Sequence, residues 1–139
     1  MMAAALQQLL AADATVTAHL ATYDFGSGAE PAVCTCDPAP ADCANPCVVV
    51  TQVIGSPWGT REAEGGEIDC DVRVWGDKDR SDAALVAAAE AIWRSVNRGA
   101  PARGGWEFGT CVADPPGRMT DTDGFPGYLI RVRIRAHVA

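Results

Sequence analysis

With 139 residues, the chain has the length of one domain, which would bury roughly two thirds of the surface that its unfolded form exposes. Its apolar content of 48% and charged content of 21% are ordinary for a globular protein. The net charge of −7 and a single lysine, Lys78, argue against a dedicated DNA-binding module, because such modules supply Lys and Arg to phosphates.

Residues 1–20 differ from a secretory signal peptide. They lack a basic n-region, and Gln7, Gln8 and Asp13 interrupt the apolar segment. No apolar run approaches the ~20 residues that a membrane-spanning helix needs. We therefore expect a cytosolic protein with no membrane partner, which is compatible with later residence in an extracellular particle.

Leucines at helical intervals in an alanine-rich segment predict a first helix over 3–12. Asp13 can cap a second short helical turn, or the first helix can simply continue. A short extended segment over 21–25 should follow. Residues 26–46 show no hydrophobic period and contain four prolines, so we expect a loop there.

The next stretch, 47–54 (CVVVTQVI), is β-branched almost throughout. This composition predicts a strand that is central or buried on both faces. A polar connection over 55–66, bounded by glycines, carries Trp58 and should join two antiparallel strands while projecting from the body.

A strand, a tight turn and a long helix over 67–99 form the clearest pattern in the sequence. Apolar and charged residues first alternate, as in a half-buried strand. Between 85 and 96 the apolar residues then recur at the spacing of an amphipathic helix. Asp79 or Ser81 can cap the start of this helix, and Gly99 stands where a left-handed residue commonly ends one.

Two further strands are predicted, over 106–112 with Val112 on the apolar side, and over 128–138. The stretch 114–127 between them is rich in Asp, Gly and Pro and should be a loop. This element order favours the α+β class, with a mainly antiparallel sheet of four to five strands and two helices packed on one face. We expect a single domain over 1–139.

Four segments occur in a fixed order: ALQQLLAADATVTAHL, VVVTQV, DCDVRVWGDKDRSDAALVAAAEAIWRSV and the terminal YLIRVRIRA. This ordered pattern resembles the small tail terminator, or tail completion, proteins of long-tailed phages and gene transfer agents. The pattern contains no catalytic signature. The resemblance covers nearly the whole chain except residues 26–46, which look like a cysteine-rich loop inserted into a single tail-terminator-like domain.

The resemblance implies a structural protein that is not an enzyme and that forms a ring, typically a hexamer. Such a ring caps the tail tube, ends tail elongation and joins the tail to the head connector. The implied partners are further copies of the chain, the tail tube protein and the head-tail connector or neck protein, while DNA passes through the lumen without sequence-specific binding. Assembly would take place in the host cytoplasm, followed by residence at the head-proximal end of the virion tail.

Three other functions stay open from the sequence. The chain could be a head-tail connector component of the neck, a monomeric zinc-binding adaptor or a small thiol enzyme. His19 and His137 have no Ser, Cys or acidic partner at a diagnostic spacing, so no catalytic residue is predicted.

A cysteine cluster is the first candidate site. Four of the cysteines fall in or beside the predicted loop: Cys34, Cys36, Cys43 and Cys47. Four thiolates on a short loop can close a tetrahedral shell around one structural zinc ion, although one residue between the first two is fewer than usual. Disulfides and unligated thiols are the alternatives. Cys70 and Cys111 fall inside predicted strands, which indicates small buried apolar residues.

Charged rows on two predicted strands are the second candidate site. The rows consist of Asp69, Asp71 and Arg73 on one strand and Arg131, Arg133 and Arg135 on the other. If the two strands pair, Asp and Arg stand opposite one another across the sheet and stabilise it. The functional hypothesis, which is compatible with the first, is that this face contacts a neighbouring subunit or lines a lumen.

Loop residues form a third set of candidates, for partner contact. Exposed loops often carry binding residues. The candidates are Trp58, Arg61, Asp121 and Asp123.

Overall fold

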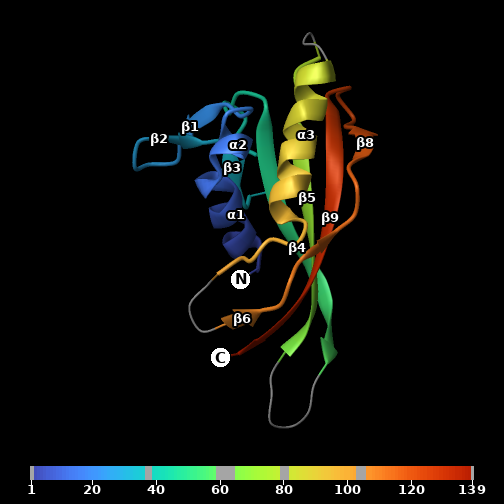
Figure 1. Ribbon diagram of the computed structural model, residues 1–139. Coiled ribbons are helices and arrows are strands. Elements are labelled where there is room, and N and C mark those ends of the chain that lie inside the picture. Colours follow the sequence, from blue (N-terminus) through green and yellow to red (C-terminus); the bar gives the residue numbers. More distant parts are fainter. Residues whose placement is uncertain (1, 37–38, 59–64, 79–81, 103–105, 139) are drawn as a thin grey trace.

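The computed structural model describes residues 2–36, 39–58, 65–78, 82–102 and 106–138. Within these ranges, helices pack on one face of a central β-sheet (Figure 1). The helices are α1 (Met2–Ala12), α2 (Ala14–Thr17) and α3 (Asp82–Val96).

The central sheet follows the order β3 (Val33–Cys34), β4 (Cys47–Trp58), β5 (Gly65–Trp75), β9 (Pro126–Val138) and β6 (Trp106–Phe108). Two short strands, β7 (Val112–Ala113) and β8 (Gly117–Thr120), also pair with β9. A separate hairpin pairs β1 (Thr22–Asp24) with β2 (Ala29–Pro31). Strands β3 and β4 are parallel, and the other described pairs are antiparallel. The predicted α+β class is therefore confirmed, with a mixed sheet that has more strands than expected.

The hydrophobic core lies between the helices and the inner face of the sheet. Alternate residues of β4, β5 and β9 point into it, and α1 and α3 supply the opposing apolar side chains. Its fully buried members include Leu6, Leu10, Val50, Val72, Ile92, Ile130 and Val132. Cys70 and Cys111 are also fully buried in this core, which confirms their prediction as small apolar residues.

Asp13 separates the first two helices. Its side chain accepts hydrogen bonds from Thr15 N (2.9 Å) and Thr15 Oγ1 (2.7 Å), which caps α2. Of the two predicted alternatives, the capped second turn is the one observed.

The end of α3 differs from the prediction in one residue. Arg98, with φ of 63°, takes the left-handed conformation that was expected for Gly99. Glycine is required at position 99 for another reason: a Cβ atom there would lie 2.7 Å from the carbonyl oxygen of Ser95. The predicted N-terminal caps, Asp79 and Ser81, lie outside the described residues.

Short strands occupy parts of two predicted loops. The stretch 26–46 contains β2 and β3, and the stretch 114–127 contains β8 and the first residues of β9. The loop predictions are wrong at these positions, because segments of two to four residues are too short to show a period of two. They become strands through pairing with other segments: β2 with β1, β3 with β4 and β8 with β9.

The predicted strand over 106–112 is interrupted. Phe108 pairs with Ala136, whereas Val112 pairs with Arg133. Between these two pairs the chain advances by four residues on the side of Val112 but by only three residues in β9. This shift by one residue reverses the side-chain parity. Val112 consequently points to the outer face and is 59% exposed, while Cys111 turns into the core.

Burial on both faces of β4 is confined to its first residues. Cys47–Val50 is buried throughout, but Val53 is 41% exposed. Both β4 and β5 run further than predicted, and their far ends extend beyond the helices (Figure 1). Half of the predicted connection over 55–66 is thus strand, and the other half lies outside the described residues.

Candidate functional site

The outer face of the sheet, opposite the helices, carries the predicted charged rows. We use the name polar face for ten described residues of this surface: Thr51, Val53, Glu67, Asp69, Asp71, Arg73, Val112, Arg131, Arg133 and Arg135. Arg135 is exposed and lies opposite Glu67. Strand register places Asp71 opposite Arg131 and Asp69 opposite Arg133. The prediction that Asp and Arg stand opposite one another across paired strands is therefore confirmed.

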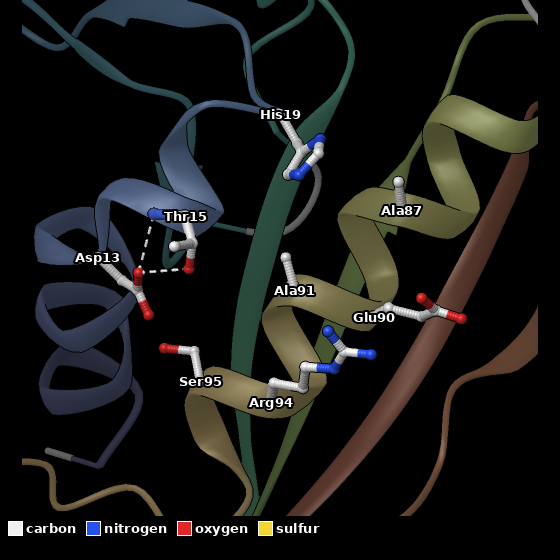
Figure 2. Close-up of a pocket in the computed structure, with 8 residues that line it drawn as sticks. All are labelled: Asp13, Thr15, His19, Ala87, Glu90, Ala91, Arg94 and Ser95. Atoms are coloured by element: carbon white, nitrogen blue, oxygen red, sulfur yellow. Dashed lines mark hydrogen bonds between the residues drawn. The ribbon is translucent and has the colours of Figure 1, made fainter.

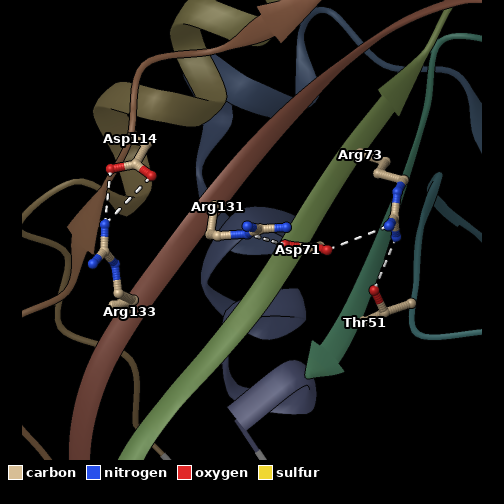
Figure 3. Close-up of polar contacts among 6 residues, drawn as sticks. All are labelled: Thr51, Asp71, Arg73, Asp114, Arg131 and Arg133. Atoms are coloured by element: carbon tan, nitrogen blue, oxygen red, sulfur yellow. Dashed lines mark hydrogen bonds and ion pairs between the residues drawn. The ribbon is translucent and has the colours of Figure 1, made fainter. Parts of the chain in front are cut away.

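Asp71 is the centre of the polar face (Figure 3). Arg131 Nε donates to Asp71 Oδ1 at 3.0 Å, and the Arg73 guanidinium donates to Asp71 Oδ2 at 3.3 Å. The Arg73 guanidinium also donates to Thr51 Oγ1 at 3.1 Å. Asp71 is 5% exposed, whereas the Arg131 side chain is 52% exposed. The carboxylate is therefore enclosed by its own donors, and the hydrogen bond from Arg131 raises the pKa of that arginine.

The neighbouring row is less completely paired. Arg133 lies opposite Asp69 in register, but its guanidinium donates to Asp114 at 3.3 Å instead (Figure 3). Asp69 Oδ1 is buried and accepts no hydrogen bond from the described residues. An unsatisfied buried acceptor costs roughly 1–3 kcal/mol. This row thus contains a carboxylate oxygen whose hydrogen-bonding capacity is unused in the isolated chain.

Two exposed valines lie in the same row as Asp69 and Arg133. Val53 is the β4 partner of Asp69, and Val112 is the β7 partner of Arg133. They are two of the three large apolar residues exposed among those described. Sequence reasoning missed both valines and Asp114. The composition of 47–54 predicts burial for Val53, the alternation over 106–112 predicts the inner face for Val112, and Asp114 reaches Arg133 only through the pairing of β7 with β9.

The chain is similar to proteins of a known family. The family described as "Tail completion protein gp17" matches residues 4–138. The chain belongs to this tail completion family. As a member, it is a structural protein of the phage tail and a component of the virion.

A chain from a solved structure entitled "Virion of native gene transfer agent (GTA) particle" shares the fold. The alignment has a TM-score of 0.63 and 19% sequence identity, and it covers 99% of this chain and 93% of that chain. No curated protein matches the sequence. The fold and the family thus agree with the resemblance that the ordered segments carry.

Four of the cysteines lie in or beside the segment at one corner of the sheet: Cys34, Cys36, Cys43 and Cys47. Cys34 lies in β3 and Cys47 begins β4, and both are buried, whereas Cys36 is exposed and Cys43 is partly buried. Burial, reinforced by the neighbouring thiols, raises the pKa of Cys34 and of Cys47 to about 12. Burial also raises the pKa of Cys43. Among the described His, Cys, Asp and Glu side chains, no group of three or more converges closely enough to hold a metal ion.

A groove of about 500 Å³ runs between α2 and α3 (Figure 2). Ala87 and Ala91 form its floor, and charged side chains such as Glu90 and Arg94 line it. Asp13 at its edge is already occupied by the α2 cap, whose hydrogen bond from Thr15 lowers the pKa of Asp13.

The predicted partner-contact residues lie in two different parts of the chain, the turn before β9 and the stretch from the end of β4 to β5. Asp121 organises the turn before β9, because its Oδ1 accepts from Asp123 N (2.9 Å) and Phe125 N (2.8 Å). Asp123 is exposed in that turn. Trp58 ends β4 at the projecting hairpin, and Arg61 lies outside the described residues. Contact with a partner stays a prediction for these positions.

Among the described residues, no helix is both long and apolar enough to cross a membrane.

Proposed function

We propose that the chain completes the tail by forming a closed ring of six of its own copies on the last ring of the tail tube. One rim of the ring contacts the tube protein and stops elongation, and the other binds the head-tail connector. Family membership over residues 4–138 is the observation that carries the tail-completion role.

The polar face is the surface that we assign to contact between copies. It presents exposed apolar side chains, Val53 and Val112, next to a carboxylate with unused acceptor capacity, Asp69. If this face lined a lumen, water would contact it and both valines would stay exposed, so their apolar surface would gain no burial. Contact with another copy would bury both valines and allow the side chains around Asp69 to rearrange and pair.

A ring requires a heterologous interface, in which one surface of a copy contacts a different surface of the next. The exposed arginines of the polar face suit an acidic counterpart, and the net charge of −7 shows that acidic surface dominates the rest of the chain. Such complementarity favours association of one copy with the next and fixes their relative orientation. DNA would pass through the lumen without sequence-specific binding.

Elongation of the tail tube provides the test of this role. Purified tube protein should polymerise to long tubes alone and to short, capped tubes when the chain is added, as measured by electron microscopy. Added tail-free connector should then bind only capped ends. Tubes of unchanged length at a molar excess of the chain would contradict termination. Unchanged length with binding to the connector would instead favour the neck-component alternative.

A further inference from the structure

The cysteine corner brings two buried thiols together on adjacent strands. Val33 pairs with Val48 and Cys34 pairs with Val49, so Cys47 lies diagonally across from Cys34 on the same face of the sheet. Both thiols are held in place: Cys34 Sγ donates to Val48 O at 3.5 Å, and Cys47 Sγ donates to Asn45 Oδ1 at 3.2 Å. The sheet therefore fixes half of a potential four-thiol site.

The other two thiols come from the segment that covers this corner. Cys36 follows β3 by two residues, and its backbone carbonyl oxygen lies 3.7 Å from Cys34 Sγ. Cys43 precedes Cys47 by four residues. The chain thus brings Cys36 to the Cys34 side of this corner and Cys43 to the Cys47 side.

This segment is held to the body by polar contacts. None of its described residues between 35 and 46 belongs to the hydrophobic core. Its polar anchors include Asn45 Nδ2, which donates to Gly76 O at 3.3 Å, and Asp42, which accepts from Tyr23 at 2.8 Å. A cross-link would add a stronger attachment to these hydrogen bonds.

Strand geometry decides which cross-link suits the fixed pair. Neighbouring strands lie about 4.8 Å apart and two residues rise about 6.6 Å, so diagonal Cα atoms are separated by roughly 8 Å. A disulfide needs Cα atoms within about 7 Å. Thiolates bound to one zinc ion at about 2.3 Å can come from residues spaced more widely, because the ion bridges them.

We propose that Cys34, Cys36, Cys43 and Cys47 bind one structural zinc ion as thiolates, which fastens segment 35–46 to the corner of the sheet. The four thiols would release their protons on binding, and zinc would supply the positive charge that stabilises the thiolates. Because no three of the described ligand side chains converge without metal, Cys36 and Cys43 must rotate inward. Both can do so, since one is exposed and the other is only partly buried.

Metal analysis tests the proposal on the full chain, purified under reducing conditions from zinc-supplemented cells. We expect about one zinc per chain by elemental mass spectrometry, and about one cobalt after exchange, with a sulfur-to-cobalt charge-transfer absorption band. The double variant Cys36→Ala/Cys43→Ala should lose the metal and the band. Thr35→Ala, an exposed neighbour in the same segment, is the matched control and should keep both.

Circular dichroism checks the folding of each variant. If the double variant is unstable, the single variant Cys36→Ala, at an exposed position, replaces it. Cys36→Ala should bind zinc at least tenfold more weakly than the wild-type chain in competition with a chelator. Less than about one tenth of an ion per reduced wild-type chain would overturn the proposal. A Cys43–Cys47 disulfide, found by peptide mapping in protein that was kept reducing and metal-replete, would overturn it equally.

Discussion

At the scale of single residues, the polar face depends on Asp71, whose carboxylate is enclosed by two arginines. Asp71→Asn should lower the free energy of unfolding by about 1–2 kcal/mol, because it weakens charge-assisted hydrogen bonds to an enclosed carboxylate. We discount larger values because the Arg131 side chain is half exposed to solvent. Urea denaturation at neutral pH measures the change.

Asp114→Asn is the control for this substitution, since Asp114 pairs with Arg133 and both side chains are about half exposed. It should change the free energy of unfolding by less than about 0.5 kcal/mol. Equal effects of the two variants would show that enclosure of Asp71 adds nothing.

The buried thiols make a second prediction at this scale. Burial raises the pKa of Cys70 to about 12 and that of Cys111 to about 11. The thiolate is the reactive form. In chelator-treated protein, iodoacetamide should therefore modify the exposed Cys36 first, while Cys70 and Cys111 stay unmodified between pH 7 and 9. Peptide mass spectrometry reads out each site, and modification of Cys111 at the rate of Cys36 would show that the core opens readily.

At the scale of elements, the end of α3 yields a backbone prediction. Gly99→Ala places a Cβ atom 2.7 Å from Ser95 O, so the backbone must shift. We expect a loss of about 1–3 kcal/mol in the free energy of unfolding. Gly117→Ala is the matched control, because its Cβ would have 3.9 Å of clearance. Thermal denaturation should separate the two variants, and a stable Gly99→Ala variant would be inconsistent with the observed close approach.

Asp13 gives the pH-dependent prediction for α2. The hydrogen bond from Thr15 lowers the pKa of Asp13 in the folded chain, so this contribution to stability is present above the ordinary value of 3.8 and is lost as pH falls below it. Asp13→Ala should cost about 0.5–1 kcal/mol at pH 7 through loss of the cap. The difference from wild type should shrink below about pH 4, as followed by denaturation across pH. A difference independent of pH would mean that the carboxylate charge is irrelevant to the cap.

Sequence periodicity was sufficient for the long elements. The alternation in β5 and β9 and the apolar stripe of α3 predicted the class, the inner face of the sheet and the two charged rows on its outer face, while the opposition of Asp71 to Arg131 depends on the register of the paired strands. Short strands such as β7 and β8 exist through tertiary pairing with β9, and no local pattern marks them. The exposure of Val112 could not be predicted for the same reason. Its face depends on the one-residue shift in register between the pairs that β6 and β7 form with β9.

At the scale of the whole molecule, the fold separates two surfaces. Helices cover the inner face of the sheet, and the polar face stays open with Asp69, Arg133 and two exposed valines in one row. Such a surface suits the contact between copies that we propose for this member of the tail completion family.

The contribution of the polar face to assembly is tested by Arg133→Glu. We expect it to dissociate the ring with only a small fall in the melting temperature of the subunit, because the Arg133–Asp114 pair is exposed, and repulsion between the introduced glutamate and the carboxylate of Asp69 accounts for that fall. Arg98→Glu, at an exposed position beyond the end of α3, changes the charge equally and should leave the ring intact. Rings of unchanged size from Arg133→Glu would remove Arg133 from the interface.

Size-exclusion chromatography with multi-angle light scattering on the wild-type chain measures its self-association. We expect one species at a fixed multiple of the 14.5 kDa chain mass, six in our proposal, that persists on dilution and forms closed rings in electron micrographs. A stable 14.5 kDa monomer at every concentration, alone and with tail tubes, would contradict it.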